Sequence, residues 1–232
     1  PERTRRRRPA PRARLGLDVP FLARWLWVWV ALGACHEARA PQVSSAAEPR
    51  NLGLAAEGLI GTGELLVVRV REAQQDGLDR NGDGDARDEL VYVLDLERGR
   101  VFDTGYAVAS EDGLPPLIAC AGATVAFAVD EAAQGARDLN GDGDALDRVL
   151  HVFEREHGSV RNLELAVRRI EVGGTLVACA IDEAGQGDQD LDADGDRDGT
   201  LLAVHDLADG STNRLGLRDA LPLAVHDGYV AL

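Results

Sequence analysis

The sequence contains no lysine and no methionine, and only 4% of its 232 residues are aromatic. Hydrophobic residues still make up 45% of the chain, so a substantial core must be built mainly from Val, Leu, Ile and Ala. The sequence also lacks a Gly-x-Ser-x-Gly motif, a phosphate-binding loop, and any His or Cys pair at zinc spacing. These absences leave no sequence support for a serine hydrolase, a nucleotide-binding or a zinc site, and we identify no catalytic residue.

Positive charge is scarce outside the first residues of the chain. The net charge is −15, and residues 1–35 hold eight arginines against only Glu2 and Asp18, so the remainder is strongly acidic. Proteins that bind nucleic acid neutralise its phosphates with Lys and Arg, and we therefore expect no nucleic-acid partner. An acidic surface instead fits a protein that binds divalent cations.

The N-terminal region has the layout of a secretion signal. A run of arginines precedes the apolar residues 25–32, which are too few to cross a bilayer as a helix. This stretch ends in Leu-Gly-Ala-Cys at Cys35 and resembles the lipobox of bacterial lipoproteins. The resemblance implies a signal peptide at 1–35, lipid attachment to Cys35, and a flexible tether at 36–58. His36, where Asp would indicate inner-membrane retention in that family, favours the outer membrane. A plain cleaved signal or an uncleaved anchor remains an alternative.

An acidic motif occurs three times in the chain, beginning at Asp79, Asp138 and Asp190. Each copy has oxygen-bearing side chains at positions 1, 3, 5 and 7, and a glycine at position 6 that permits a sharp turn. Two carboxylates ~4 Å apart repel by about 4 kcal/mol at an effective dielectric near 20. Ca²⁺ takes six to eight oxygen ligands and would remove that repulsion, so we expect three calcium sites. The candidate ligands are Asp79, Asn81, Asp83, Asp85 and Asp88 in the first copy, Asp138, Asn140, Asp142, Asp144 and Asp147 in the second, and Asp190, Asp192, Asp194, Asp196 and Asp198 in the third.

These motifs differ from EF-hands, because position 12 is apolar in all three and a strand-like segment follows. Asp88 and Asp147 at position 10, or Asp198 at position 9, can supply the missing carboxylate. The motifs resemble the D-x-D-x-D-G calcium loops found in β-hairpins of integrin-type propellers and related bacterial repeat proteins. The alternative is a solvated polar turn, since Asn-Gly and Asp-Gly are ordinary hairpin sequences.

A second pattern accompanies each acidic motif. The sequence Glu-Ala-x-Gln precedes every copy, with Glu72, Glu131 and Glu183 each seven residues before position 1. We hypothesise that these glutamates fold back onto the loop, either as outer ligands or as pins. A solvated, helix-like turn is the alternative.

Short apolar segments rich in β-branched residues flank each motif, and their length favours strands over helices. With the glycine turns that follow, each unit has four antiparallel strands and carries its acidic loop between the second and third. This pattern resembles the blades of TolB-type and related β-propellers. We therefore predict an all-β fold, an incomplete β-propeller; an open β-solenoid or hairpin array is the alternative.

The predicted repeat domain covers residues 59–232. Its units span about 59–109, 110–168 and 169–219, with a partial unit at 220–232. Propellers have roughly four to eight blades, so about three blades and the start of a fourth indicate a fragment of a longer protein.

The predicted function is that of an exported, lipid-anchored calcium-binding module of the cell envelope. It would present a rigid surface to a protein or glycan partner. Two alternatives stay open: a fragment of a propeller hydrolase or lyase whose site lies in further blades, and a calcium-dependent adhesin. Cys120 and Cys179 fall in apolar strands and are either a disulfide or two buried thiols.

Overall fold

The computed structural model describes residues 51–109, 116–222, 224–226 and 228–232. Asn51–Leu232 form a compact unit of their own. The predicted signal peptide, the predicted lipid-attachment residue Cys35 and most of the predicted tether lie outside the described residues. Among the residues that the structure describes, no helix is long and apolar enough to cross a membrane.

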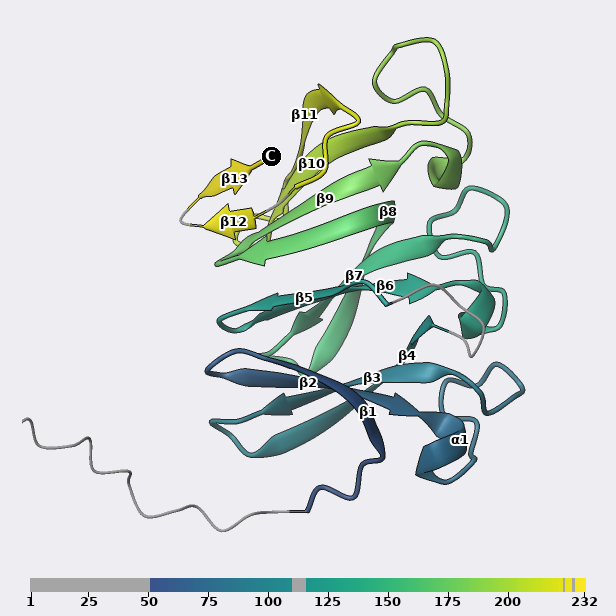
Figure 1. The fold of residues 1–232 in the computed structure, drawn as a ribbon, viewed down its shortest axis with the longest axis vertical. Coiled ribbons are helices and arrows are strands. Elements are labelled where there is room, and N and C mark those ends of the chain that lie inside the picture. Colours follow the sequence, from purple (N-terminus) through teal and green to yellow (C-terminus); the bar gives the residue numbers. More distant parts are fainter. Residues whose placement is uncertain (1–50, 110–115, 223, 227) are drawn as a thin grey trace, which may run out of the picture. The chain divides into compact units, whose positions relative to one another are not determined.

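The described chain is built almost entirely of strands, as Figure 1 shows. The strands are β1 (Ala56–Gly61), β2 (Leu65–Arg71), β3 (Glu89–Asp95), β4 (Arg100–Ala109), β5 (Ile118–Ala121), β6 (Thr124–Asp130), β7 (Arg148–Glu154), β8 (Ser159–Gly173), β9 (Leu176–Asp182), β10 (Thr200–Asp206), β11 (Thr212–Arg218), β12 (Ala224–His226) and β13 (Tyr229–Ala231). Three single turns of helix follow β2, β6 and β9, namely α1 (Glu72–Gln75), η2 (Ala132–Gln134) and η3 (Ala184–Gln186).

The strands form antiparallel sheets, which confirms the predicted all-β class. One sheet has the order β1-β2-β3-β4, a second has the order β11-β10-β9-β8-β7-β6-β5, and β12 pairs with β13. The long strand β8 changes partner along its length: residues 159–166 pair with β7, and residues 167–173 pair with β9. The three acidic motifs lie in the β2–β3, β6–β7 and β9–β10 connections, where the sequence predicted them.

The boundary predicted for the tether is wrong at its C-terminal end. Strand β1 begins at Ala56, inside the segment assigned to the tether, and Gly53 and Ala55 are hydrogen-bonded to Gln75. This start of β1 was not predicted, because β1 is mostly exposed and lacks a regular apolar alternation.

The core is mainly aliphatic, as the low aromatic content predicted. One cluster of buried residues joins the first sheet to β6 and β7 and includes Leu65, Val91 and Phe127. A second cluster extends from β6 to β10. Because both clusters draw on residues from adjacent units, burial of these side chains holds neighbouring units together.

A buried ion pair also links the first sheet to the second. Arg155, which follows β7, donates from Nε and Nη2 to the two carboxylate oxygens of Asp95 at 2.8 and 2.9 Å. The Asp95 side chain is fully buried, and this hydrogen-bonded guanidinium holds the pKa of the carboxyl well below its usual range. The same arginine donates from Nη1 to Glu64 at 2.7 Å.

The two described cysteines are free thiols. Cys120 lies half-buried on β5, and Cys179 is buried on β9. Burial raises the pKa of the Cys179 thiol to about 12, so it stays protonated near neutral pH. The structure thus has two thiols rather than the disulfide that the sequence left open.

Candidate metal-binding loops

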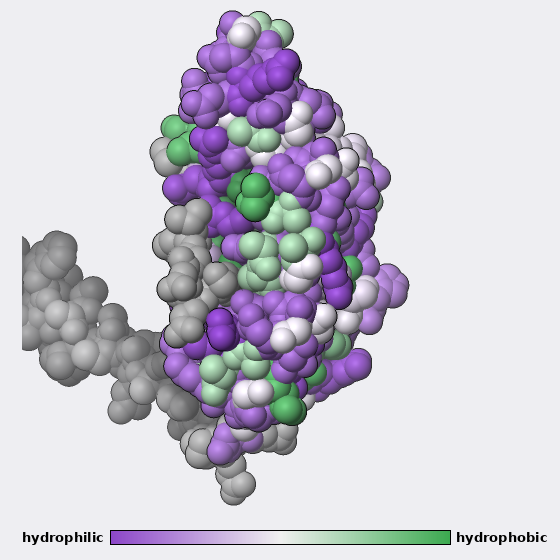
Figure 2. Space-filling view, turned by 90° about the vertical axis from the view of Figure 1, so that its right-hand side faces the viewer, coloured by the Kyte–Doolittle hydropathy of each residue, from purple (hydrophilic) through white to green (hydrophobic). Residues whose placement is uncertain are grey.

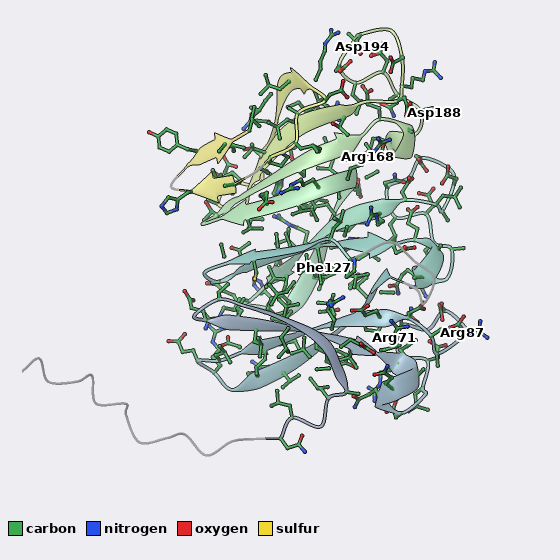
Figure 3. The ribbon with its side chains drawn as sticks, in the orientation of Figure 1. Arg71, Arg87, Phe127, Arg168, Asp188 and Asp194 are labelled. Carbon is green, nitrogen blue, oxygen red and sulfur yellow. The ribbon has the colours of Figure 1, made fainter. Side chains whose placement is uncertain are left out.

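Three loops that contain the acidic motifs lie on one side of the sheets (Figure 1), and we call residues 79–88 loop 1, residues 138–147 loop 2 and residues 190–199 loop 3. Figure 2 views that side, which is largely hydrophilic. Figure 3 labels Arg87 on loop 1 and Asp194 on loop 3.

In loop 1 the backbone curls around the carboxylate at position 1. Asp79 Oδ1 accepts hydrogen bonds from the amides of Gly82 and Asp83 at 2.6 and 3.2 Å, and its Oδ2 accepts from Gly84 at 3.0 Å. Gly84, at position 6, has a φ of 109°, a backbone conformation that residues with a side chain rarely adopt. The sharp turn predicted for position 6 is therefore present.

Loops 2 and 3 repeat this arrangement. The amides of Gly141 and Gly143 donate to Asp138 at 2.6 and 3.1 Å. The amides of Asp194 and Gly195 donate to Asp190, each at 3.1 Å. The position-1 aspartate is thus the centre of every loop.

The aspartates at positions 5 and 7 also cap local turns. In loop 1, Asp83 Oδ1 accepts from the Asp85 amide, and Asp85 Oδ1 accepts from the Arg87 amide, both at 2.9 Å. The corresponding bonds form in loops 2 and 3. Each of these bonds engages only Oδ1 of its carboxylate, so the loop holds its acidic side chains in a defined orientation.

A buried glutamate joins the two ends of each loop. Glu72 Oε1 accepts from the Arg80 amide at 2.6 Å, and its Oε2 accepts from the Asp88 amide at 3.3 Å. Glu131 bonds in the same way to residues 139 and 147, and Glu183 to residues 191 and 199. All three glutamates are fully buried. Of the two roles that the sequence suggested, these bonds correspond to the pin.

The same glutamates lie beside aspartate oxygens. In loop 1, one oxygen each of Glu72, Asp85 and Asp88 lie within 4.8 Å of one another. The equivalent cluster in loop 2 consists of Glu131, Asp144 and Asp147, and loop 3 brings together Glu183, Asp190 and Asp192. Each loop therefore gathers three carboxylates, and one of the three is a residue that the sequence placed outside the motif.

The electrostatic cost of these clusters falls on Asp88, which is buried, and on Asp147, which is half-buried. Burial, with the nearby Asp83 carboxylate, raises the pKa of Asp88 to about 7. Burial and repulsion from Asp142, Glu131 and Asp144 raise the pKa of Asp147 to about 7. The crowded carboxylates therefore disfavour the charged form of Asp88 and of Asp147.

Not every predicted ligand joins a cluster. The side chain of Asp198 is 93% exposed, and one of its oxygens lies 3.9 Å from Arg168 Nη2. The carboxylate that the sequence sought at position 9 of loop 3 is therefore not brought to the other acidic groups. Asp192 at position 3 is there instead, and burial raises its pKa.

In loops 1 and 2 the asparagine at position 3 reaches the next unit. Asn81 Nδ2 donates to the Ala133 carbonyl of η2 at 2.7 Å and to Asp88 Oδ2 at 3.2 Å. Asn140 Nδ2 donates to the Gly185 carbonyl of η3 at 2.7 Å. These contacts were not predicted, because each acceptor lies about fifty residues further along the chain.

Glycines allow this close approach between units. A Cβ on Gly135 would lie 3.2 Å from the Cβ of Asp83, and one on Gly187 would lie 3.2 Å from the Cβ of Asp142. Both glycines follow the short helical turn and have positive φ values of 74° and 77°. Position 5 of a loop thus packs against the helical turn of the following unit.

No protein-family model and no curated protein matches this chain. Among solved structures, the crystal structure of the tricorn protease aligns with 68% of this chain at 9% sequence identity and a TM-score of 0.30. The chain spans 18% of that protein. A similarity at this level does not identify a family.

Proposed function

We propose that this chain is a calcium-binding β-repeat module in which each acidic loop takes up one Ca²⁺. The observation that carries the proposal is the buried glutamate of each loop. It ties the two ends of its loop together and lies within 4.8 Å of two aspartate oxygens, and loops 1 and 2 have this arrangement at equivalent residues.

The donor set favours calcium over other common metals. The clustered groups are all carboxylates, which suit hard cations, whereas zinc sites usually include His or Cys. Ca²⁺ accepts six to eight oxygens in flexible geometry, while Mg²⁺ demands an octahedron and keeps its waters. Loops with carboxylates or amide oxygens at positions 1, 3, 5 and 7 can supply such a number of oxygens.

For the fold we propose successive blades of a β-propeller. In support, the sheet β1-β2-β3-β4, the segment from β5 to residue 166, and the segment from residue 167 to β11 each have four strands in the same order. Strands β12 and β13 would begin a fourth blade. In this arrangement each calcium would stiffen the hairpin between the second and third strands.

We also propose that the module is exported and lipid-anchored through Cys35, with residues 1–35 as its signal peptide, and that it resides at the outer membrane. It would present a rigid surface to a protein or glycan partner, with no nucleic-acid partner. Mass spectrometry of the protein isolated from bacterial membranes tests the anchor. The proposal requires a mature chain that begins at a diacylated or triacylated Cys35.

Calcium binding is tested by titration of the full chain and by calorimetry. We expect three Ca²⁺ per chain, with dissociation constants of about 10⁻⁴ to 10⁻³ M if the sites behave as extracellular modules do. At free calcium tenfold above the dissociation constant, each site adds about 1.4 kcal/mol of stability. The melting temperature should therefore rise with calcium and fall with EDTA.

A matched pair of variants connects that result to the loops. Glu131→Gln should lower the stoichiometry from three Ca²⁺ to two, whereas Glu156→Gln, on an exposed turn of the same unit, should leave it unchanged. A protein that binds no calcium and melts at the same temperature with and without EDTA would refute the proposal.

A further inference from the structure

Residues 51–55, which precede β1, have the backbone of the end of a fourth strand. Gly53 has a φ of 69°. The equivalent residues of β4, β8 and β11 are Gly105, Glu164 and Gly216, with φ values of 68°, 59° and 63°. Glu164 adopts this conformation although it is not glycine, which indicates that the position requires it.

An aspartate or asparagine two residues earlier stabilises this turn in residues 51–53, in β4 and in β8. Asn51 Oδ1 accepts from the Gly53 amide at 2.8 Å, as Asn162 Oδ1 accepts from the Glu164 amide at 2.7 Å. In β4, Asp103 takes the same role towards Gly105 at 3.1 Å. Residues 51–53 therefore match β4 and β8 in conformation and in hydrogen bonding.

The glutamine of the Glu-Ala-x-Gln sequence holds residues 51–55 as it holds a fourth strand. Gln75 Oε1 accepts from the Ala55 amide at 2.6 Å, and its Nε2 donates to the Gly53 carbonyl at 2.8 Å. Elsewhere this glutamine bonds to the fourth strand of the preceding unit: Gln134 to Ala107 and Gly105 at 2.8 and 3.2 Å, and Gln186 to Ala166 and Glu164 at 2.9 and 3.2 Å.

The strand register gives the same correspondence independently. Ala56 pairs with Val70, and a bulge follows before Gly58. In β8, Val167 pairs with Ile181, and a bulge follows before Arg169. Residues 51–61 therefore correspond to residues 162–172, which makes Ala55 the counterpart of Ala166.

An ion pair recurs at the same place with its charges exchanged. Glu57 lies 3.6 Å from Arg71, and Arg168 lies 2.8 Å from Asp182. Figure 3 labels both arginines.

In the part of the chain that the structure describes, residues 51–55 lack the neighbouring third strand with which β4, β8 and β11 each pair. Ala107, Ala166 and Arg218 each face position 12 of their own unit's loop, at Leu90, Val149 and Leu201. Strand β1 is at the edge of its sheet, and no described strand pairs with residues 51–55. Leu59 of β1 is 61% exposed. Gln74 of α1 is exposed too, whereas the equivalent residues of η2 and η3, Ala133 and Gly185, are buried.

We propose that residues 51–55 are the fourth strand of a further repeat of this type and that its third strand docks along their open edge. Position 12 of that repeat's loop would face Ala55. An asparagine at position 3 of the same loop would donate its amide to the Gln74 carbonyl, as Asn81 and Asn140 do to the units that follow them.

The repeat that docks on this edge is not one of those within residues 1–232. In a second copy of this chain β3, β7 and β10 are already paired on both edges, and loop 3 has Asp192, without an amide donor, at position 3. Residues 1–50 contain no acidic motif. The inference needs no bound calcium, so it can hold even if the metal proposal fails.

A peptide tests the docking directly. Residues 138–154, which comprise loop 2 and β7, contain no cysteine and supply a third strand with Asn140 and Val149 at positions 3 and 12. We expect a fluorescent form of this peptide to bind the full chain saturably in fluorescence anisotropy, and a scrambled peptide not to bind. An Asn140→Asp peptide should bind about two- to tenfold more weakly, because it lacks the amide that donates to the Gln74 carbonyl.

Cross-linking tests the register. The full-chain variant Ala55→Cys should form a mixed disulfide with a Val149→Cys peptide several-fold faster than with a Leu150→Cys peptide, since adjacent strand residues point to opposite faces. Peptide mapping by mass spectrometry separates this product from any adduct at Cys120. Three results would overturn the proposal: no saturable binding, equal cross-linking of the two peptides, or self-association of the chain that the peptide competes away.

Discussion

Loops 1 and 2 are near copies, whereas loop 3 departs from both at positions 3, 4, 8, 9 and 10. At positions 3, 4 and 10, where loops 1 and 2 have Asn, Gly and Asp, loop 3 has Asp192, Ala193 and Gly199. It nevertheless gathers three carboxylates around its glutamate, using positions 1 and 3 in place of 7 and 10. The buried glutamate is thus the constant part of the site, and the aspartates that accompany it can change.

The difference at position 3 also concerns the neighbouring unit. Asn81 and Asn140 donate an amide hydrogen to the next helical turn, whereas Asp192 has no hydrogen to donate. At loop 3, Arg218 Nη2 instead donates to the Asp192 carbonyl at 3.0 Å. Among the described residues, the two loops with an amide at position 3 are the two that bond to a following helical turn, and loop 3 uses that position for a carboxylate.

The largest effect should come from the part that all three loops share. Glu131→Ala removes the acceptor of two backbone amides, those of Leu139 and Asp147. Each unsatisfied buried donor costs about 1–3 kcal/mol, so the free energy of unfolding in calcium should fall by roughly 2–4 kcal/mol.

Glu183→Ala should cost a similar amount in loop 3. Urea unfolding measures both variants, with Glu156→Ala as the control, expected to lie within about 0.5 kcal/mol of the wild type. A change at Glu131 no larger than the control's would mean that the glutamate does not pin the loop.

The next effect should distinguish loop 2 from loop 3. Asn140→Asp removes the hydrogen bond to Gly185 and adds a charge beside Asp147, so stability in calcium should fall by about 1–3 kcal/mol. The reciprocal change, Asp192→Asn, removes one clustered carboxylate and should raise the calcium dissociation constant of one site about tenfold.

Urea unfolding and calcium titration of the two variants together decide this point. If Asn140→Asp leaves the stability unchanged while Asp192→Asn lowers it, the roles assigned to position 3 are reversed.

The smallest effect concerns position 4. Gly141 has a φ of 80° and Ala193 a φ of 59°. Gly141→Ala should destabilise the chain by about 1 kcal/mol, because a left-handed conformation costs a side chain roughly that amount. Ala193→Gly should have a smaller effect of the opposite sign, since the relief of strain is partly offset by the entropy of glycine. Paired thermal melts measure both changes, and equal signs would contradict this explanation.

Sequence patterns predicted the second and third strands of each unit well. The apolar segments that flank the acidic motifs appear as β2, β6 and β9 before them and as β3, β7 and β10 after them. Their apolar, β-branched composition matches their burial on both faces, so local pattern and tertiary environment agree. The first strand β1, by contrast, is mostly exposed, and its residues were partly assigned to a tether.

The loops themselves follow from the sequence because their hydrogen bonds are local. Position 1 accepts from amides three to five residues on, and positions 5 and 7 accept from amides two residues on. Residues so close along the chain meet in any fold that allows the turn. Local sequence did not predict that Asp192, rather than Asp198, joins the carboxylate cluster of loop 3. That outcome depends on which of the two side chains the sheet buries.

The sequence by itself determined three acidic turns between strands, each with a glutamate at a constant distance. Only the tertiary structure decided which carboxylates meet and which residues bind the next unit. The reason is distance along the chain: a turn organises its neighbours through bonds of a few residues, whereas the carbonyls of Ala133 and Gly185 reach a loop only after whole sheets have packed.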